Sequence, residues 1–321
     1  RLIQLMKKKL LILGATGFIG KNLLYYYSKK KTYEIHCTYF KSKIIKIKGI
    51  TWTKVDLRKP LDVNKIIKGK DIVIQAAATT SGSKVIVNSP QLHVTDNAIM
   101  NSNILRASHE NFVKHFIFFS CTVMYPHSKK YLNENYKIDP YKINKKYFGV
   151  ANTKLYIEQM CKFYSLIGKT KYTCIRHSNV YGPNDKFELE KSHFFSANIT
   201  KVLNSKNNKI IIWGDGKEKR DMVYIDDLLN FVNLVISKQK KNFEIYNCGY
   251  GKSLRVIDII NQIIKISKKK ITVYFDKSKP SIKTNILISS IKAHLNLGWR
   301  PKTSLNKGIS KTIYWYKNKI K

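Results

Sequence analysis

The stretch Leu10-Leu11-Ile12-Leu13-Gly14-Ala15-Thr16-Gly17-Phe18-Ile19-Gly20 runs from an apolar strand through three glycines into a helix. Gly14 permits the tight turn, Gly17 lets the backbone approach a phosphate, and Gly20 lets the helix lie close to the strand. Backbone N–H groups at the helix start then favour negative charge. The pattern predicts a dinucleotide site, with an ordinary glycine-rich turn as the alternative. The residues expected to contact the dinucleotide are Gly14, Thr16, Gly17, Phe18, Ile19 and Gly20.

Strands and helices alternate on both sides of this turn through about the first 180 residues. Short apolar runs predict the strands, and longer amphipathic segments predict the helices between them. This alternation indicates an α/β fold, a Rossmann-like, doubly wound parallel sheet. The expected strands are near 9–14, 33–38, 51–55, 71–77, 115–120 and 171–177, and the expected helices near 17–29, 61–68, 88–109 and 145–168.

The regular alternation loosens in the C-terminal half of the chain. There the pattern predicts a smaller mixed substrate lobe with strands near 209–213, 243–247 and 271–275, and helices near 194–205, 225–238, 254–267, 287–295 and 305–318. We expect a dinucleotide-binding domain over residues 8–178 and a substrate lobe over residues 179–321. Some strands and helices are expected to cross between the two.

The composition argues against a membrane-spanning protein, a nucleic-acid-binding protein and a metalloprotein. The 321 residues can bury a large core, and no apolar run reaches the length of a membrane span. The net charge of +40 comes almost entirely from lysines spread along the chain, with only seven arginines, which favours a solvated surface over a nucleic-acid site. Five dispersed cysteines without a C-x-x-C pair favour reduced thiols in the cytoplasm and no metal site.

The end of the second predicted strand indicates which dinucleotide is bound. In an NAD site an Asp or Glu commonly closes this strand and binds the ribose diol. Here the segment His36-Cys37-Thr38-Tyr39-Phe40-Lys41-Ser42-Lys43 has no acid, and Lys41, Ser42 and Lys43 are placed to meet a 2′-phosphate. We predict NADP(H), with NAD(H) and a lysine of purely compositional origin as the alternative. Further expected cofactor contacts, after the third and fourth strands, are Asp56, Leu57, Ala76, Ala77 and Ala78.

Four more segments resemble the extended short-chain dehydrogenase/reductases of the NAD-dependent epimerase/dehydratase family. They are 97–105 (NAIMNSNIL), 120–126 (SCTVMYP), 179–193 (NVYGPNDKFELEKSH) and 276–299. Within that family the chain resembles the GDP-L-fucose synthases, which are GDP-4-keto-6-deoxymannose epimerase/reductases. The resemblance implies hydride transfer at C4 of a hexose carried on a nucleoside diphosphate.

The resemblance also implies a Ser/Thr, Tyr and Lys active site, with Tyr and Lys one helical turn apart. Lys154 matches the lysine, which binds the nicotinamide ribose, and His177 is expected to contact the cofactor nearby. Val150 stands where the tyrosine is expected. The nearest phenol, Tyr147, lies seven residues before Lys154, roughly 10.5 Å along a continuous helix. Tyr147 is therefore either the replacement for the tyrosine or a half-buried aromatic residue at the helix start.

The serine and epimerase positions are altered as well. Cys121 stands at the serine position, and Thr122 beside it is the better hydrogen-bond donor, although Cys121 fits a plain packing role. Val123 replaces the acid/base cysteine of the fucose synthase pattern, whereas its histidine partner is present as His193. These changes favour reduction over double epimerisation. The candidate catalytic residues are Lys154, Thr122, Tyr147, Cys121 and His193.

The resemblance places the substrate on residues of the C-terminal half. Arg220 matches an arginine that binds the diphosphate, for which a guanidinium fork is suited. A surface ion pair with Asp221 or Asp226 is the structural alternative for Arg220. The other candidate substrate residues are Asn179, His193, Lys279 and Lys283.

Three functions stay open from the sequence. The first is an NADP(H)-dependent reductase, with or without epimerase activity, acting on a 4-keto sugar of GDP in surface polysaccharide biosynthesis. The second is an NAD-dependent nucleotide-sugar 4-epimerase or dehydratase. The third is a catalytically silent regulator or RNA-binding protein, motivated by Val150 and the charge. The resemblance further implies a homodimer formed by the helices near 88–109 and 145–168, and no membrane partner.

Overall fold

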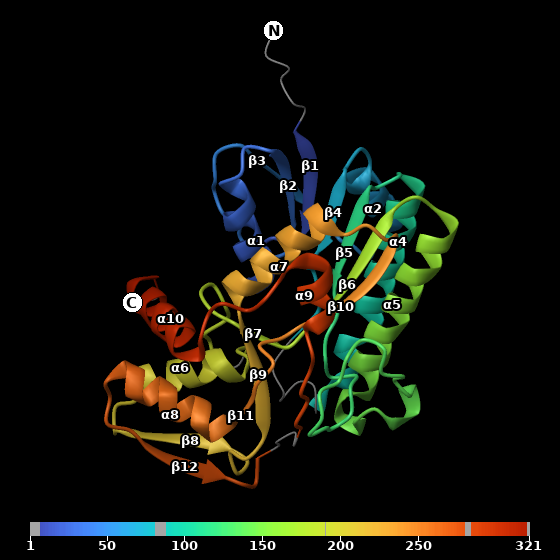
Figure 1. Ribbon diagram of the computed structural model, residues 1–321. Coiled ribbons are helices and arrows are strands. Elements are labelled where there is room, and N and C mark those ends of the chain that lie inside the picture. Colours follow the sequence, from blue (N-terminus) through green and yellow to red (C-terminus); the bar gives the residue numbers. More distant parts are fainter. Residues whose placement is uncertain (1–6, 81–87, 190, 280–283, 320–321) are drawn as a thin grey trace.

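A sheet of seven parallel strands forms the centre of the larger lobe (Figure 1). The computed structural model describes residues 7–80, 88–189, 191–279 and 284–319. The strand order is β3-β2-β1-β4-β5-β6-β10, so the order reverses at β1, as in a doubly wound Rossmann-like sheet. The predicted fold class is confirmed. The strands are β1 (Lys8–Leu13), β2 (Tyr33–Tyr39), β3 (Ile50–Lys54), β4 (Ile72–Gln75), β5 (His115–Phe119), β6 (Lys171–His177) and β10 (Phe243–Cys248).

Helices cover both faces of this sheet because consecutive apolar residues of each strand point to opposite faces. Leu10 and Ile12 of β1 pack against α1 (Phe18–Ser28) and α7 (Ile225–Lys238). Leu11 and Leu13 join the cluster on the other face. That face is covered by α2 (Pro60–Ile67), α4 (Thr95–Glu110) and α5 (Phe148–Ile167).

The smaller lobe is a mixed structure below the large sheet in Figure 1. Its three-stranded sheet has the order β11-β9-β7, and β12 pairs with β8 in a separate parallel pair. The strands are β7 (Asn179–Tyr181), β8 (Lys209–Trp213), β9 (Lys219–Tyr224), β11 (Ser253–Arg255) and β12 (Thr272–Asp276). The helices of the C-terminal half are α6 (Phe194–Asn204), α7, α8 (Val256–Ser267), α9 (Ile291–Leu297) and α10 (Leu305–Lys319).

The structure corrects three expectations for the C-terminal half. The strand expected near 243–247 is β10, which joins β6 in the large sheet rather than the smaller lobe. The short strands β7, β9 and β11 were not predicted. The helix expected near 287–295 begins only at Ile291, because Leu132 bonds to the backbone of Leu287 and forms a bridge with Ile288.

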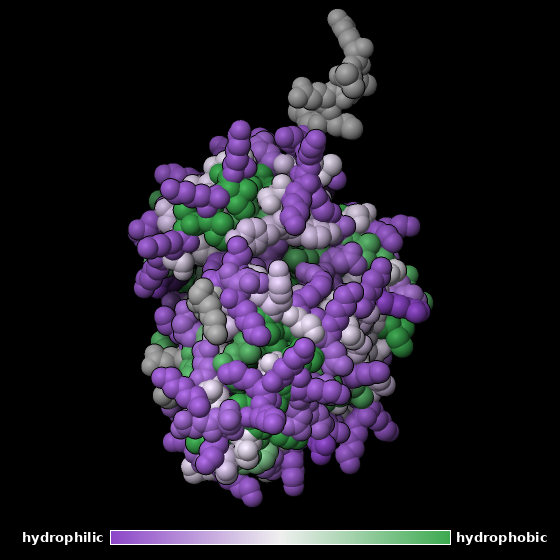
Figure 2. Space-filling model, turned by 90° about the vertical axis from the view of Figure 1, so that its left-hand side faces the viewer, coloured by the Kyte–Doolittle hydropathy of each residue, from purple (hydrophilic) through white to green (hydrophobic). Residues whose placement is uncertain are grey.

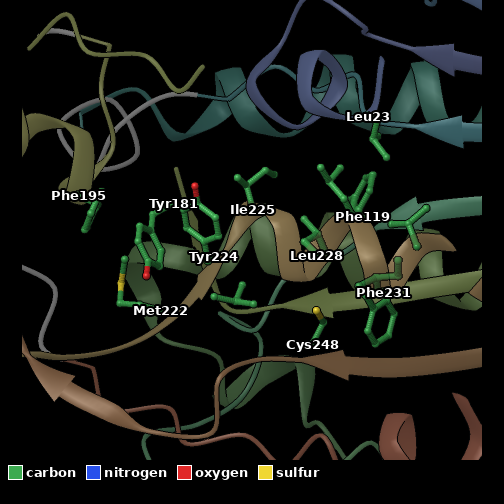
Figure 3. Packing of buried hydrophobic residues seen from close by; sticks show 14 of the residues in the cluster. Leu23, Phe119, Tyr181, Phe195, Met222, Tyr224, Ile225, Leu228, Phe231 and Cys248 are labelled. Atoms are coloured by element: carbon green, nitrogen blue, oxygen red, sulfur yellow. The ribbon is translucent and has the colours of Figure 1, made fainter. Parts of the chain in front are cut away.

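One hydrophobic core joins the two lobes (Figure 3). Tyr181, Phe195 and Tyr224 of the smaller lobe belong to the same buried cluster as Leu23 of α1 and Phe119 of β5. The rings of Tyr181 and Phe195 lie 4.4 Å apart between centroids. The lobes therefore pack as a single body around the edge of the large sheet.

Hydrophilic side chains are spread over the face shown in Figure 2, with small apolar patches between them. They do not gather into one stripe on that face. No helix in the described part of the chain is both long and apolar enough to cross a membrane.

A buried histidine makes the fold sensitive to acid. His115 on β5 is buried, and its Nε2 lies 2.8 Å from Thr173 Oγ1. Burial, together with nearby Lys171, lowers the pKa of His115 to about 3. That value lies below the pKa of about 6.5 in an unfolded chain, so the stabilisation is complete above about pH 6.5 and disappears as the pH falls.

As the pH falls from about 6.5 towards 4, we expect the free energy of unfolding of His115→Gln to decrease less than that of the natural protein. The slopes of the free energy of unfolding against pH should differ by at most about 1.4 kcal/mol per pH unit. Urea unfolding at a series of pH values measures it. Parallel curves for the two proteins would contradict this assignment.

Candidate active site

The glycine turn is shaped by close backbone contacts that exclude side chains. Gly14 has φ +72°, and a Cβ there would lie 2.6 Å from the Cα of Ala77. A Cβ on Gly20 would lie 2.2 Å from the Gly14 carbonyl oxygen, whereas Gly17 has room at 3.4 Å. Among the described residues no side chain caps α1, and its first turn holds no acid. The first N–H groups of α1 are therefore available to a phosphate.

The carboxyl ends of the parallel strands bring the predicted cofactor residues to one edge of the sheet. The segment Gly14–Gly20 follows β1, and 76–78 follow β4 next to it. Ser120 follows β5, and Ser178 follows β6. This edge is where doubly wound sheets bind their ligands.

A ladder of amide side chains holds the small residues after β4. Gln75 Oε1 accepts from the Ala77 N–H at 3.1 Å, and Gln75 Nε2 donates to Asn101 Oδ1 at 3.1 Å. Asn97 exchanges two hydrogen bonds with the Thr79 backbone, at 3.0 and 2.9 Å. These roles explain the asparagines of the 97–105 segment, which contribute rigidity to the cofactor edge.

Arg58, which the sequence reasoning did not single out, lies beside the end of β2. Arg58 donates to both oxygens of Asp56, at 2.9 and 2.8 Å, and its guanidinium lies 5.7 Å from the Phe40 ring centre. These hydrogen bonds lower the pKa of Asp56 to about 2. Lys41 lies beside the same ring, while Leu57 is buried in the core. Arg58 is also paired with Asp96 at 3.3 Å, so its charge is shared by two carboxylates, while Lys41 and Arg58 both lie beside Phe40 after β2.

Lys154 lies at the carboxyl end of β5, on the inner face of α5. Its Nζ donates to the Phe119 carbonyl at 2.7 Å and lies 4.5 Å from the Phe118 ring centre. Burial lowers the pKa of Lys154, and the neighbouring groups Cys121 and Glu158 oppose that shift. The ammonium is therefore fixed beside the strand end where the nicotinamide half of a dinucleotide is expected.

The loop after β5 holds the altered serine position. Burial raises the pKa of the Cys121 thiol, and nearby Lys154 opposes that shift. Thr122 is also buried, and its carbonyl accepts from the Tyr125 N–H at 3.0 Å. Lys154 thus has a thiol as its neighbour at the position where the family pattern has a hydroxyl.

Tyr147 lies just before α5. The α-helix begins at Phe148, one residue later, and Tyr147 ends the 3₁₀ turn η3 (Lys145–Tyr147). Its ring packs against the same buried cluster as Cys121 and Val123, and it lines a cavity of about 230 Å³. Burial raises the pKa of Tyr147, and the positive charge of Arg220 opposes that shift. Tyr147 therefore lines this cavity, and it lies outside α5, the helix that carries Lys154.

A buried ion pair supports the same loop from below. Arg176 Nη2 lies 2.6 Å from Glu158 Oε2, and both side chains are almost fully buried. Ser120 donates to Glu158 at 2.6 Å, and Arg176 Nη1 donates to the Tyr125 hydroxyl at 2.9 Å. Tyr125 in turn donates to Asn247 at 2.9 Å. The network ties β5, β6, β10 and α5 together under the active-site loop.

Three histidines lie on different elements that meet at this end of the sheet, and one of them, His177, interacts with Lys154. His177 ends β6, and its pKa is lowered to about 4 by burial, with Lys154 and His193 adding to the effect. His193 is exposed just before α6. His93 ends the turn η1 (Pro90–His93), and burial together with His193 lowers its pKa. The sequence reasoning identified His177 and His193 but missed His93.

Arg220 and Asn179, two of the other candidate substrate residues, donate hydrogen bonds within the chain. Arg220 donates to the Lys219 carbonyl at 2.9 Å and to Thr284 Oγ1 at 2.8 Å, and Asp226, one of the two carboxylates expected as its alternative partner, pairs with Lys311. Asn179 Nδ2 donates to the Asp221 carbonyl at 3.0 Å. Lys279 is exposed after β12, and Lys283 lies outside the described residues.

The family model named NAD dependent epimerase/dehydratase family matches residues 10–249. The chain belongs to this enzyme family. It is 28% identical to the GDP-L-colitose synthase of Yersinia pseudotuberculosis over 317 residues, which cover 97% of this chain and 98% of that protein. It is 29% identical to the GDP-L-fucose synthase of Sinorhizobium fredii over 266 residues, covering 81% of this chain and 83% of that protein.

The solved structures of this family share the fold. The UDP-glucose 4-epimerase of Thermotoga maritima matches with a TM-score of 0.87 at 22% identity, covering 98% of this chain and 100% of that one. The family model and the two relatives confirm the expected family, and this structure shows the shared fold. The glycine cradle at Gly14 and Gly20, which any Cβ would fill, fits the dinucleotide of the epimerase/dehydratase family.

The epimerase/dehydratase site departs from the family pattern where proton transfer is expected. Val150 stays on α5 four residues before Lys154, so no phenol lies one turn from the ammonium. Within the described residues, no cluster of three or more His, Cys, Asp and Glu side chains is arranged to hold a metal ion. The candidate proton donors that the sequence predicts near this position are hydroxyls and a histidine, in Thr122, Tyr147 and His193.

Proposed function

We propose that the protein is an NADP(H)-dependent oxidoreductase acting at C4 of a GDP-linked 4-keto sugar, as a reductase with or without epimerase activity. We also propose that its product is a precursor in the biosynthesis of surface polysaccharides. The observation that carries the proposal is Lys154, fixed at the carboxyl end of β5 beside a cradle shaped for a dinucleotide. The relatives named GDP-L-colitose synthase and GDP-L-fucose synthase support the choice of a GDP-sugar.

In this proposal, different residues bind the cofactor, donate the proton and bind the diphosphate. The N–H groups of α1 would bind the pyrophosphate, and Lys154 would hold the nicotinamide ribose. Reduced dinucleotide, when bound, supplies the hydride for sugar C4. Thr122, Tyr147 and His193 would be the candidate donors to the sugar oxygen, and Arg220 would bind the diphosphate.

Two assays test this function. Purified protein is mixed with NADPH and GDP-4-keto-6-deoxymannose, and absorbance loss together with proton NMR of the product measures reduction and epimerisation. NADPH oxidation with a reduced C4 supports the proposal. Interconversion of C4 epimers of a UDP-sugar without external cofactor would favour a 4-epimerase instead, as in several solved relatives. No reaction, together with salt-sensitive RNA binding, would contradict an enzyme role.

The preference for NADP(H) rests on Arg58 and Lys41 at the end of β2. We expect Arg58→Ala to raise the KM for NADPH roughly tenfold to a hundredfold while changing the KM for NADH little. The matched control is Arg255→Ala, which removes a similar exposed pair with Asp258 outside the cleft. Equal effects of Arg58→Ala on both cofactors would contradict the assignment of NADP(H).

We further propose a homodimer formed through α4 and α5. Both helices expose apolar side chains, and their outer surfaces are tied by a hydrogen bond between Ser102 and Tyr156 at 3.1 Å. The exposed apolar residues are Ile99, Phe163, Leu166 and Ile167. Analytical ultracentrifugation of the Phe163→Glu, Ile167→Glu double variant should show a monomer, whereas a dimer would contradict this interface.

Restoring the missing phenol is a gain-of-function test. Val150 is only half buried, so Val150→Tyr places a hydroxyl one turn before Lys154 on the same helix face. We expect this change to raise kcat for the keto sugar by about tenfold or more, since a positioned acid contributes that much or more. Val150→Phe is the control, and an equal response of both variants would contradict a proton-donor role.

A further inference from the structure

One peptide at the end of β5 is held by two side chains of α5. Lys154 Nζ donates to the Phe119 carbonyl at 2.7 Å, and the hydroxyl of the next residue, Ser120, donates to Glu158 Oε1 at 2.6 Å. Lys154 and Glu158 are four residues apart, so they lie on the same face of the helix. Because the peptide that joins Phe119 to Ser120 is planar, its carbonyl moves whenever the Cα of Ser120 moves.

The adjacent strand β6 holds the same peptide from its other side. The Ser120 N–H donates to the Ile175 carbonyl at 2.8 Å, and the residue after Ile175 is Arg176. The Arg176 guanidinium donates to both Glu158 oxygens, so Glu158 binds a side chain next to this hydrogen bond on each strand. Ser120 and Glu158 are only 1% and 3% exposed. Water therefore offers neither group a substitute partner.

The ammonium of Lys154 has donors left for a ligand. It carries three N–H groups, and the Phe119 carbonyl accepts from one of them. Among the described residues the structure shows no second acceptor for Lys154 Nζ, and the centre of the Phe118 ring lies 4.5 Å away. The placement of two donors for a ribose diol therefore depends on the position of the Phe119 carbonyl.

We propose that Ser120 is a positioning residue for Lys154. Its hydroxyl, bound to Glu158, fixes the carbonyl that holds the ammonium, and thereby keeps the two other N–H groups in place for the nicotinamide ribose. The contact of Lys154 with the ribose belongs to the proposed function, on which this inference rests. Ser120 itself touches neither cofactor nor substrate and acts through the lysine. An error of about 1 Å in the position of such a group lowers a rate by about a hundredfold.

The first test uses the protein without ligands. The nitrogen NMR signal of the Lys154 ammonium, assigned with Lys154→Met, is compared between the natural protein and Ser120→Ala. We expect a separate, slowly exchanging signal in the natural protein and a broadened one in Ser120→Ala, because the acceptor of the ammonium is no longer fixed. An unchanged Lys154 signal in Ser120→Ala would overturn the proposal.

The matched control is Ser165→Ala, which removes another buried hydroxyl, one that donates to the Lys162 carbonyl at 2.6 Å within α5. It should leave the Lys154 signal unchanged. Ser120→Ala retains the pair of Arg176 and Glu158, so both variants should keep a cooperative thermal melt. Equal broadening of the Lys154 signal in the two variants would show a general loosening of the helix, and would overturn the proposal.

The second test uses the cofactor. Ser120→Ala should raise the Kd for NADPH about threefold to tenfold by calorimetry, whereas Ser165→Ala should leave it unchanged. Lys154→Met combined with Ser120→Ala should bind NADPH as Lys154→Met alone does, because Ser120 acts through the lysine. Additive losses in the double variant would overturn the proposal.

Turnover separates this inference from the proposed function. Ser120→Ala should lower kcat about tenfold or more while leaving the KM for the GDP-sugar within about threefold, since the change acts at the cofactor. A rise in that KM with an unchanged kcat would overturn the proposal. If the natural protein turns over no nucleotide sugar, the proposed function fails, while the NMR and NADPH measurements still decide the link between Ser120 and Lys154.

Discussion

Lys154→Met should lower kcat for NADPH oxidation by roughly a hundredfold to ten-thousandfold, in line with the loss of a positioned acid–base group. The ammonium is held at 2.7 Å from the Phe119 carbonyl, where it would position the ribose and the reacting centre. Because burial lowers the pKa of Lys154, replacing it by a neutral chain of similar length should leave the fold intact. Steady-state kinetics and a thermal melt measure the two effects.

The control for this change is Lys162→Met, an exposed lysine on the same helix. It should leave kcat and Tm unchanged, since exposed lysines contribute little to either. Full activity of Lys154→Met would contradict the assigned site. A large loss of Tm would instead assign Lys154 to the fold.

Arg176→Met should destabilise the protein by about 3–5 kcal/mol, because it leaves the Glu158 carboxylate buried without its partner. The loop that carries Cys121 and Thr122 should then lose its order, since Tyr125 and Ser120 bond to the same network. Urea unfolding measures the first effect, and proteolysis within the loop measures the second.

Two variants separate charge from packing in this prediction. Arg176→Met combined with Glu158→Gln should regain part of the lost stability, because the unpaired charge is gone. Arg255→Met removes an exposed arginine pair and should change stability by less than about 1 kcal/mol. A loss for Arg176→Met no larger than that of Arg255→Met would contradict the role of the buried pair.

The sheet could be predicted because its signals are local. The run Leu10-Leu11-Ile12-Leu13 is buried on both faces, and a parallel strand of that kind has an unbroken apolar sequence. The strands β7 and β11 have only three residues each, and long-range pairing alone defines them. For the same reason 287–290 looked helical, although the bridge from Leu132 to Ile288 holds the chain extended.

The candidate cofactor residues were easier to predict from the sequence than the candidate catalytic residues. Glycines at a fixed spacing indicate the turn directly, whereas Lys154 meets the Phe119 carbonyl, and Arg176 meets Glu158, only after the fold has formed. The rarity of arginine is a sequence signal that could have identified further residues with specific partners. Arginine is rare in this lysine-rich chain, so each arginine is expected to have a specific partner. Arg58 and Arg176 both have one, in Asp56 and Glu158.

The position of β10 has a consequence for how the chain folds during its synthesis. β10 covers the outer edge of β6, yet it is made more than sixty residues after that strand. Until residue 248 has left the ribosome, β6 presents an open edge of the kind that pairs with other chains. The emerging chain is therefore exposed to aggregation through the synthesis of this interval, and the large sheet is complete only when most of the protein has been made.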